Sequence, residues 1–306
     1  MSFKSLNAKT ILLIVAVILV FLIGSAVVLS LFTISAPSSS YFTKKVAVIP
    51  IKGEIVMERS SFSPEFGALA IVEKLEEADA DPSVGVIFLD IDSPGGSVVA
   101  TKQIVYKIRE LNKPSVAYIG EAGASGAYYV AAATDYVIAD SGSIVGSIGV
   151  ISIIPNIEKL LENWGVEVEV LTEGKFKGSG SIFESLSEEE KALFLNIMEE
   201  VFVEFKEDIL EFRQGKLQRE KFEEIADGRI LSGKQALEAK LVDELLPREQ
   251  AIEKAARLAG IEGKPSVTTY YKEEPSIFDL FFVGGKAFAE GFKESISDAG
   301  SASIKT

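Results

Sequence analysis

The sequence predicts a mixed α/β fold built around a mostly parallel β-sheet. Short apolar runs rich in Val and Ile alternate with helix-like segments from residue 45 to about residue 180. Because these runs are almost continuously apolar, we expect strands that are buried on both faces and joined by right-handed helical crossovers. A long amphipathic pattern after this region predicts a helical extension, and an uncharged apolar run before it predicts one transmembrane helix.

The elements follow one another in a regular order along the chain. Apolar runs predict strands at 45–56, 84–91, 114–120, 136–140, 149–152 and 166–172. Helical patterns lie at 66–79, 97–112, 124–133 and 156–164. The amphipathic helix at 187–214 has Ser187 as its N-cap, glutamates in its first turn and Gly215 after its end. Two further helices are expected at 232–240 and 247–259.

The composition excludes several kinds of chemistry. The 306 residues include neither cysteine nor histidine, so the chain has no thiol nucleophile, disulfide, zinc finger or Ser-His-Asp triad. With 31 basic against 45 acidic residues, the formal net charge of -14 repels a phosphate backbone, and nucleic acid is not an expected partner. A catalytic site must therefore use Ser, Thr, Lys, Asp, Glu or Tyr.

The N-terminal region predicts a membrane anchor. The run from Ile11 to Phe32 carries no charge and, as a helix, is long enough to cross the roughly 30 Å hydrocarbon core. Lys4 and Lys9 precede it, which favours a cytoplasmic N-terminus at 1–10, a Ser/Pro linker at 33–44 and a following domain outside the cytoplasm. The alternative is a cleaved signal peptide, whose apolar region is usually shorter than this one.

Two glycine-rich turns carry candidate site residues. Asp92 to Ser97 (DSPGGS) follows a buried strand and precedes a helix, where backbone N–H groups can bind an oxyanion or a phosphate; an ordinary strand-to-helix turn is the alternative. The chain lacks the GxxxxGK[ST] phosphate loop. Ser125, in GASGA, begins the next helix and is a candidate nucleophile, although an incidental serine among close-packed small residues has the same pattern.

A serine nucleophile needs a base, and lysine is the substitute for the absent histidine. A lysine base must be held neutral by desolvation, which lowers its pKa from about 10.4. Lys175 and Lys177 follow the apolar run at 166–172 among small residues, but spacing alone does not choose between them. Because the base must lose a proton, an alkaline optimum is expected.

At this point the sequence resembles the signal peptide peptidase A family of membrane-anchored Ser/Lys proteases. The resemblance covers residues 45 to about 260 and rests on five motifs in order: DSPGGS at 92–97, GASGAYYVAAATD at 123–135, GSIGVI at 146–151, GKFKGSGS at 174–181 and DGRILSGKQALEAKLVDEL at 227–245. It implies a fold of the Clp protease and crotonase type, a protease domain at 45–262 and a C-terminal tail of unknown role at 263–306. The residue after Lys177 is Gly178, where many family members carry a polar residue.

The resemblance also implies a site and a mechanism. Ser125 matches the nucleophile, Lys177 the general base and Ser147 the hydroxyl that orients the lysine, so that Lys175 is a bystander. Gly95 and Gly96 match the turn that forms the oxyanion hole, and no metal or cofactor is implied. The expected substrates are remnant signal peptides or other hydrophobic peptides at the extracytoplasmic membrane face. Several copies are expected to form a ring in which neighbouring subunits share each site.

Three alternatives remain open from the sequence. A related membrane protease that cleaves hydrophobic segments of stomatin-like proteins would share the Ser/Lys chemistry. A crotonase-type acyl-CoA enzyme would use paired carboxylates, for which Asp92, Glu121 and Glu173 are available. The third alternative is a catalytically silent scaffold.

Overall fold

The computed structural model describes residues 17–25, 44–58 and 67–270. The chain consists of two compact units, Met1–Thr43 and Lys44–Thr306, and the second unit contains the sheet and the helices that pack on it. Residues 17–25 are helical, whereas the rest of the expected membrane span at 11–32 and the linker up to residue 43 lie outside the described residues. Within those ranges, none of the helices combines the length and the apolar character that crossing a bilayer requires.

An eight-stranded sheet forms the centre of the second unit. Its strands are β1 Lys45–Lys52, β2 Val84–Ser93, β3 Ser115–Ala124, β4 Tyr136–Ala139, β5 Ile144–Gly146, β6 Ile230–Ser232, β7 Glu244–Leu245 and β8 Val267–Thr269. The main path runs β6-β5-β3-β2-β1-β8, and β4 pairs with both β3 and β7. All pairs are parallel except β5 with β6, which confirms the expected α/β class with a mostly parallel sheet.

Helices cover both faces of the sheet. They are α2 Ala68–Ala80, α3 Val98–Arg109, α4 Gly126–Ala132, α5 Glu158–Asn163, α6 Glu188–Phe212, α7 Arg219–Ile225, α8 Gly233–Glu238 and α9 Arg248–Leu258. One core cluster joins the sheet to α2, α3, α4 and the C-terminal half of α6, and a second joins it to α9. Strand β2 is buried along nearly its whole length, as its continuous apolar run predicts.

Two of the expected strands are absent from the described part of the chain. The run at 149–152 is not a strand; β5 ends just before it, because Gly146 (φ 95°) and Ser147 (φ 49°) turn the backbone out of the sheet. The run at 166–172 also forms no strand. Valine and glutamate alternate in this run as in a strand, but no neighbouring strand among the described residues pairs with it. Its side chains Val166 and Val168 are accordingly 46% and 45% exposed.

The sheet continues beyond the region that the sequence pattern marked out. Strands β6 and β7 come after residue 180, where the alternation of strands and helices was expected to end. Strand β8 lies past residue 262, the expected end of the domain, and pairs in parallel with Val46–Val48 of β1. Each of these strands is only two or three residues long, too short to give a periodic signal.

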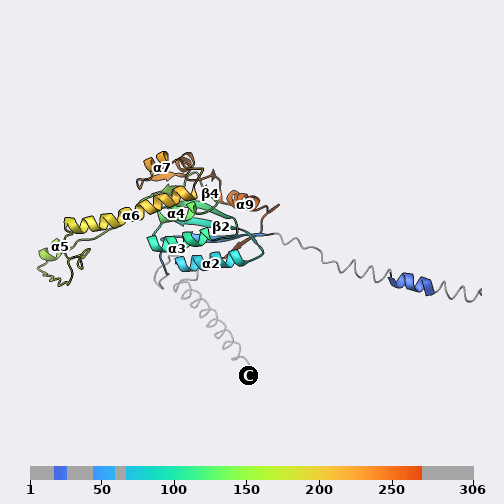
Figure 1. Ribbon diagram of the computed structural model, residues 1–306, viewed down its shortest axis with the longest axis horizontal. Coiled ribbons are helices and arrows are strands. Elements are labelled where there is room, and N and C mark those ends of the chain that lie inside the picture. Colours follow the sequence, from blue (N-terminus) through green and yellow to red (C-terminus); the bar gives the residue numbers. More distant parts are fainter. Residues whose placement is uncertain (1–16, 26–43, 59–66, 271–306) are drawn as a thin grey trace, which may run out of the picture. The chain divides into compact units, whose positions relative to one another are not determined.

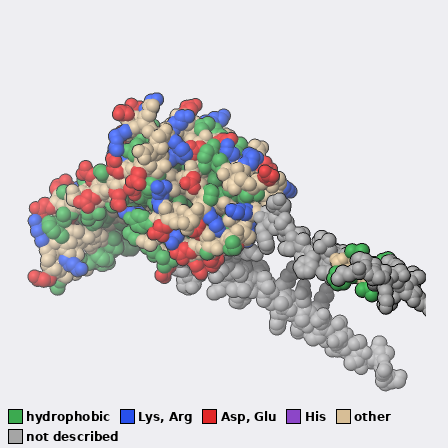
Figure 2. Space-filling view, turned by 45° about the vertical axis from the view of Figure 1, so that its right-hand side comes forward, with side chains coloured by type: hydrophobic (Ala, Val, Ile, Leu, Met, Phe, Trp, Pro, Cys, Tyr) green, Lys and Arg blue, Asp and Glu red, His purple; other side chains and the backbone are tan. Residues whose placement is uncertain are grey.

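Helix α6 carries an arm away from the sheet. Its N-cap is Ser187, as expected, with a complete capping box to Glu190. Its buried residues, Phe205 and Ile209, both lie in its C-terminal half, whereas its N-terminal half extends outward toward α5 (Figure 1). We call residues 150–200 the arm. Hydrophobic side chains are visible along this projecting part in Figure 2, and the most exposed are Ile151, Ile153, Trp164, Leu171, Leu195 and Ile197.

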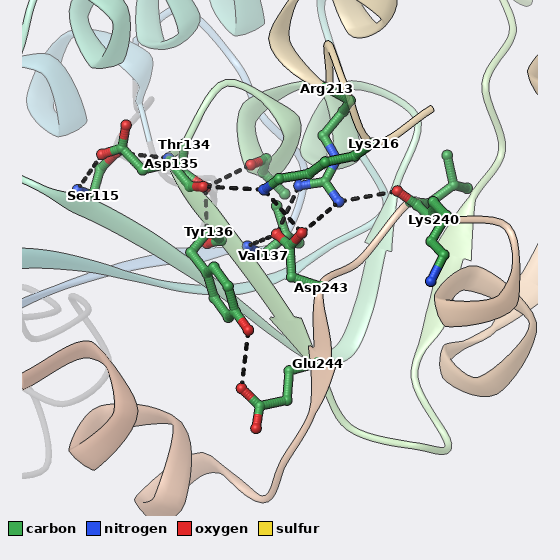
Figure 3. A network of polar contacts seen from close by, with 12 residues as sticks. Ser115, Thr134, Asp135, Tyr136, Val137, Arg213, Lys216, Lys240, Asp243 and Glu244 are labelled. Atoms are coloured by element: carbon green, nitrogen blue, oxygen red, sulfur yellow. Dashed lines mark hydrogen bonds and ion pairs between the residues drawn. The ribbon is translucent and has the colours of Figure 1, made fainter. Parts of the chain in front are cut away.

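A buried ion pair fixes the C-terminal end of α6 to the sheet (Figure 3). Arg213, 1% exposed, donates from Nη1 to Asp243 Oδ2 at 2.7 Å and from Nη2 to the Lys240 carbonyl oxygen at 3.0 Å. Asp243 also accepts from the Val137 backbone N–H of β4 at 2.8 Å, and it pairs with Lys216 at 2.9 Å. The helix that carries the arm is therefore joined to the strands by charged hydrogen bonds as well as by apolar contacts.

Candidate active site

Ser125 lies at the sharp turn between β3 and α4. Its backbone has φ 51° and ψ -123°, a conformation that non-glycine residues rarely adopt and that is found where structure imposes strain for function. It is the N-cap of α4, yet its hydroxyl makes no capping hydrogen bond. The side chain is therefore free to face a substrate at a helix N-terminus, where the partial positive charge favours developing negative charge.

Two backbone N–H groups lie beside Ser125 without an acceptor among the described residues. They belong to Gly96, which follows the β2 strand, and to Gly126, the first residue of α4. The N–H of Gly95, in contrast, donates to Ser93 Oγ at 3.1 Å. Among the described residues the N–H groups of Gly96 and Gly126 are thus the ones open to an oxyanion, and the expected role of the Gly95–Gly96 turn stays a prediction.

The glycines of this turn are required by close packing. A Cβ at Gly95, whose φ is 97°, would lie 2.7 Å from the Gly126 backbone nitrogen. A Cβ at Gly96 would lie 2.2 Å from the Ile55 carbonyl oxygen, because Ile55 bridges to this segment through hydrogen bonds with Gly95 and Ser97. A side chain at Gly95 would therefore displace the Gly126 N–H, and one at Gly96 would displace the turn from Ile55.

Ser147 lies at the end of the strand next to Ser125. The Ser125 N–H donates to the Gly146 carbonyl oxygen at 2.8 Å, and the Ser147 N–H donates to the backbone carbonyl oxygen of Arg229 at 2.8 Å. Ser147 is partly exposed and has φ 49°. Two serines with left-handed backbones therefore follow neighbouring parallel strands, and both come from motifs that the sequence singled out.

A small pocket of about 100 Å³ opens beside Ser125. Gly96, Ser125 and Gly126 form one side of it. The remaining walls come from α3, α4, α6 and the extended segment after Ser147, and they consist of Val98, Thr101, Lys102, Tyr129, Gly149, Val150, Ile151, Val201, Glu204 and Phe205. Most of these side chains are apolar, so the space beside the serine suits an uncharged side chain of modest size.

The two candidate lysines lie on the arm, away from this pocket. Lys177 is exposed in the turn that precedes α6, and it does not line the pocket or bond to Ser125. Lys175 forms an exposed ion pair with Glu189 at 2.6 Å. A single chain therefore does not bring Ser125 and a candidate lysine base together.

The carboxylates considered for an acyl-CoA enzyme are also separate from Ser125. Asp92 and Glu121 line a different, open cavity at the ends of β2 and β3, where Asp92 Oδ1 accepts from the Ala122 N–H at 3.1 Å. Glu173 is exposed on the arm. Asp92 and Glu121 therefore share a cavity that does not include Ser125, and none of the three carboxylates lines the pocket beside the unpaired N–H groups, where the available group is a hydroxyl nucleophile.

The fold and the turn at Ser125 define a class of enzyme, the serine hydrolases with a mostly parallel α/β core. Comparison with known proteins gives the family: residues 107–262 match peptidase family S49, and the chain belongs to that family. It is 32% identical over 291 residues to a putative protease of Methanocaldococcus jannaschii, a match that covers 93% of each chain.

Two further relatives carry more specific names. A putative signal peptide peptidase SppA of Enterococcus faecium is 29% identical over 262 residues, covering 83% of this chain and 75% of that one. Protease 4 of Haemophilus influenzae is 30% identical over 217 residues, covering 70% of this chain but 35% of that longer protein. The chain is thus a serine protease of the signal peptide peptidase A type, as the motifs indicated.

Four residues that lie around Ser125 were not among the candidates expected from the sequence: Gly126, Val201, Glu204 and Phe205. Gly126 could have been found, because it is the first residue of a helix directly after the candidate serine. The contribution of α6 could not: Val201, Glu204 and Phe205 lie in an ordinary amphipathic pattern. Only the packing of α6 against Tyr129 of α4, with ring centroids of Tyr129 and Phe205 4.8 Å apart, brings them to the pocket.

Proposed function

We propose that the chain is a membrane-anchored serine endopeptidase in which Ser125 is the nucleophile and Lys177 is the general base. The observation that carries this proposal is the position of Ser125. It has a positive φ, lies at a helix N-terminus and lines a mostly apolar pocket together with Gly96 and Gly126, whose N–H groups are unpaired among the described residues. That arrangement suits the attack of a hydroxyl on a peptide carbonyl.

The reaction would follow the steps of acyl transfer. A neutral Lys177 accepts the proton of Ser125, and the serine oxygen attacks the carbonyl carbon of the substrate. The N–H groups of Gly96 and Gly126 stabilise the negative oxygen of the tetrahedral intermediate. The lysine then gives its proton to the leaving amine, and water hydrolyses the acyl-enzyme. Ser147, at the end of the adjacent strand, orients the lysine amine.

The base would come from a neighbouring copy of the chain. Lys177 lies on the arm, which carries exposed apolar side chains such as Trp164, 73% exposed, and Leu171, 84% exposed. Burying such side chains against a second copy would be favourable, at roughly 25 cal/mol per Å² of apolar surface. A homo-oligomeric ring would place the Lys177 of one subunit beside the Ser125 of the next.

The N-terminal region would attach this ring to a membrane. In this proposal residues 11–32 span the bilayer, residues 1–10 remain in the cytoplasm, and residues 33–44 link the span to an extracytoplasmic protease domain that begins at residue 45. Remnant signal peptides and other hydrophobic peptides would then be the substrates. The apolar pocket beside Ser125 and the name of the Enterococcus faecium relative support this substrate class.

A mixing experiment tests the shared site. The full chain would be prepared as Ser125→Ala, Lys177→Ala and Lys175→Ala, and each variant would be sized in detergent to compare its assembly. Cleavage of fluorogenic Leu-containing peptides and of a synthetic signal peptide would be followed for each variant, and for Ser125→Ala mixed with Lys177→Ala. Lys175→Ala is the matched control, since it removes a lysine two residues away in the same turn.

The outcomes separate the parts of the proposal. We expect the wild type and Lys175→Ala to cleave, the other two variants to be inactive at normal size, and their mixture to recover part of the activity. Recovery requires a site built from the Ser125 of one subunit and the Lys177 of another. Inactivity of the mixture after proven exchange of subunits contradicts the shared site, and cleavage by Ser125→Ala contradicts the nucleophile.

A further inference from the structure

The pocket beside Ser125 contains one ion pair among its apolar walls. Lys102 of α3 and Glu204 of α6 both line the pocket, and the Lys102 ammonium pairs with the Glu204 carboxylate. Their side chains are 19% and 49% exposed, so the lysine is the more enclosed partner. The pair joins the two helices that flank α4 and the candidate nucleophile.

Each partner is charged and is compensated by the other. Burial acts to lower the pKa of Lys102, but the hydrogen bonds to Glu204 and Tyr106 outweigh it and raise the pKa above its ordinary value. The ammonium also lies 5.7 Å from the centre of the Tyr106 ring. Asp208, one turn further along α6, accepts a hydrogen bond from the hydroxyl of Tyr129, which lines the pocket. The walls therefore present matched charges to whatever enters the pocket.

Loss of one partner would leave the charge of the other unpaired at the edge of the pocket, where the side chain of Lys102 is 19% exposed and that of Glu204 is 49% exposed. An unpaired charge in such a position is unfavourable, and a substrate side chain of opposite charge is the group that can neutralise it. An intact pair has the reverse effect, because it offers neither sign of charge to the substrate. Selection against charged substrates then comes from a residue pair and not only from the apolar lining.

We propose that the Lys102–Glu204 ion pair determines which substrate side chain the pocket accepts: it restricts the residue whose carbonyl Ser125 attacks to uncharged, apolar types. This inference rests on the proposed function, since it assigns the pocket to the residue on the acyl side of the cleaved bond. Lys102 and Glu204 are specificity-determining residues in this assignment and take no part in the proton transfers.

Matched variants of the full chain test the proposal. Cleavage would be measured for acetyl-Ala-Ala-X-aminomethylcoumarin peptides in which X is Leu, Lys or Glu. Lys102→Met leaves Glu204 unpaired, Glu204→Gln leaves Lys102 unpaired, and the double variant Lys102→Glu with Glu204→Lys reverses the pair. Glu207→Gln is the control, because it breaks an α6 ion pair with Arg219 of α7 that does not line the pocket.

The expected result is a change of preference and not a general loss of activity. In Lys102→Met the ratio of kcat/KM for the Lys peptide over the Leu peptide rises about tenfold, and in Glu204→Gln the Glu to Leu ratio rises about tenfold. The double variant returns both ratios to within about threefold of wild type, and Glu207→Gln leaves them unchanged. A purely structural ion pair would change the rates for all three peptides together.

Two results would overturn the proposal in distinguishable ways. If the wild type cleaves the Leu peptide in a Ser125-dependent manner but both single variants keep its preference within twofold, the ion pair does not set specificity and the proposed function stands. If no peptide is cleaved in a Ser125-dependent manner by any form, including the wild type, the proposed function fails and the specificity assignment fails with it.

Discussion

The backbone N–H of Ser125 donates a hydrogen bond to the carbonyl oxygen of Gly146 over 2.8 Å. This bond continues the parallel ladder of β3 and β5, which pairs Ala122 with Ile144 and Ala124 with Gly146. The strained turn at Ser125 is therefore held by the sheet beneath it. Because Ser147 directly follows Gly146, the same bond also fixes the distance between the backbones of the two serines that the motifs singled out.

The strain at Ser125 predicts a gain in stability when the serine is replaced by glycine. A non-glycine residue in this backbone conformation costs about 1–3 kcal/mol, and glycine avoids most of that cost. We expect Ser125→Gly to unfold about 2–4 °C higher than Ser125→Ala, a shift that corresponds to roughly 1 kcal/mol. Both variants should lose peptidase activity.

Thermal unfolding of both variants by circular dichroism checks this expectation, with peptide cleavage measured in parallel. Equal melting temperatures for Ser125→Gly and Ser125→Ala would show that the backbone at Ser125 relaxes at little cost. In that case the conformation would not be a strained feature retained for catalysis.

The packing at Gly95 predicts that a single methyl group removes activity. A Cβ at Gly95 would lie 2.7 Å from the Gly126 nitrogen, so we expect Gly95→Ala to displace an N–H group of the proposed oxyanion site. Loss of one such donor typically lowers kcat about 100- to 1000-fold. Gly53→Ala is the matched control: Gly53 also has a positive φ, 72°, but a Cβ there meets no atom within 4 Å.

Steady-state kinetics and melting temperatures of the two glycine variants distinguish backbone strain, which both variants introduce, from displacement of the Gly126 N–H, which only Gly95→Ala introduces. Both variants should lose some stability, since both place alanine at a positive φ. Only Gly95→Ala should lose kcat. If both variants retain wild-type kcat, the N–H of Gly126 is not positioned by Gly95, and the oxyanion site lies elsewhere.

The sequence predicted the inner strands of the fold well and the outer ones poorly. Strands β1, β2 and β3 are eight to ten residues long and buried, so their apolar runs are continuous and bounded by turns. The run at 166–172 has the alternation of a strand but lies exposed on the arm, because hydropathy does not reveal whether a partner strand exists. Strand β8 has three residues and is a strand only because β1 has a free edge beside it.

For the candidate site, the residues that share one turn were predictable and those that meet through tertiary packing were not. Ser125 and Gly96 lie after strands that are neighbours in a parallel sheet, so their motifs converge at one edge. Glu204 reaches the same place from the middle of α6, and no pattern in the sequence marks it. Lys177 could be named only through family resemblance, because its position on the arm gives no contact with Ser125 within one chain.

The Arg213–Asp243 pair makes stability depend on pH. Burial acts to raise the pKa of Asp243, but the hydrogen bonds from Arg213 and Lys216 outweigh it and hold the pKa below its ordinary value. A lowered folded-state pKa adds stability above the unfolded value of about 3.9, and this stability is lost as the pH falls through the folded-state pKa. We therefore expect the wild type to lose stability progressively below about pH 5.

Replacing Arg213 should lower the free energy of unfolding strongly at neutral pH and less strongly in acid. Breaking one side of a buried pair costs about 3–5 kcal/mol, because the remaining charge is left buried. In Arg213→Met the Asp243 carboxylate loses this partner and can be relieved by protonation, so the difference from wild type should narrow between pH 7 and pH 4. Arg219→Met, which breaks the exposed pair with Glu207, is the control and should change little.

Urea unfolding of the three proteins at several pH values measures these differences. A constant difference between wild type and Arg213→Met from pH 7 to pH 4 would contradict the electrostatic explanation. It would mean that Arg213 stabilises the end of α6 by packing and by its hydrogen bond to the Lys240 carbonyl oxygen.

Strand β8 predicts where the protease domain can be shortened. The Val46 N–H donates to the Ser266 carbonyl oxygen at 2.8 Å, and the Tyr270 N–H donates to Val48 at 3.0 Å, so a chain that ends at residue 262 loses these bonds and exposes the edge of β1. At about 1 kcal/mol for each backbone hydrogen bond, we expect it to be roughly 2–4 kcal/mol less stable, and to aggregate through the open edge. A chain that ends at residue 270 keeps β8 and these hydrogen bonds, and it is the matched control. Thermal unfolding and light scattering compare the two shortened chains. Equal melting temperatures and equal scattering would mean that β1 tolerates a free edge and that a domain ending at residue 262, as expected from the sequence, folds without β8.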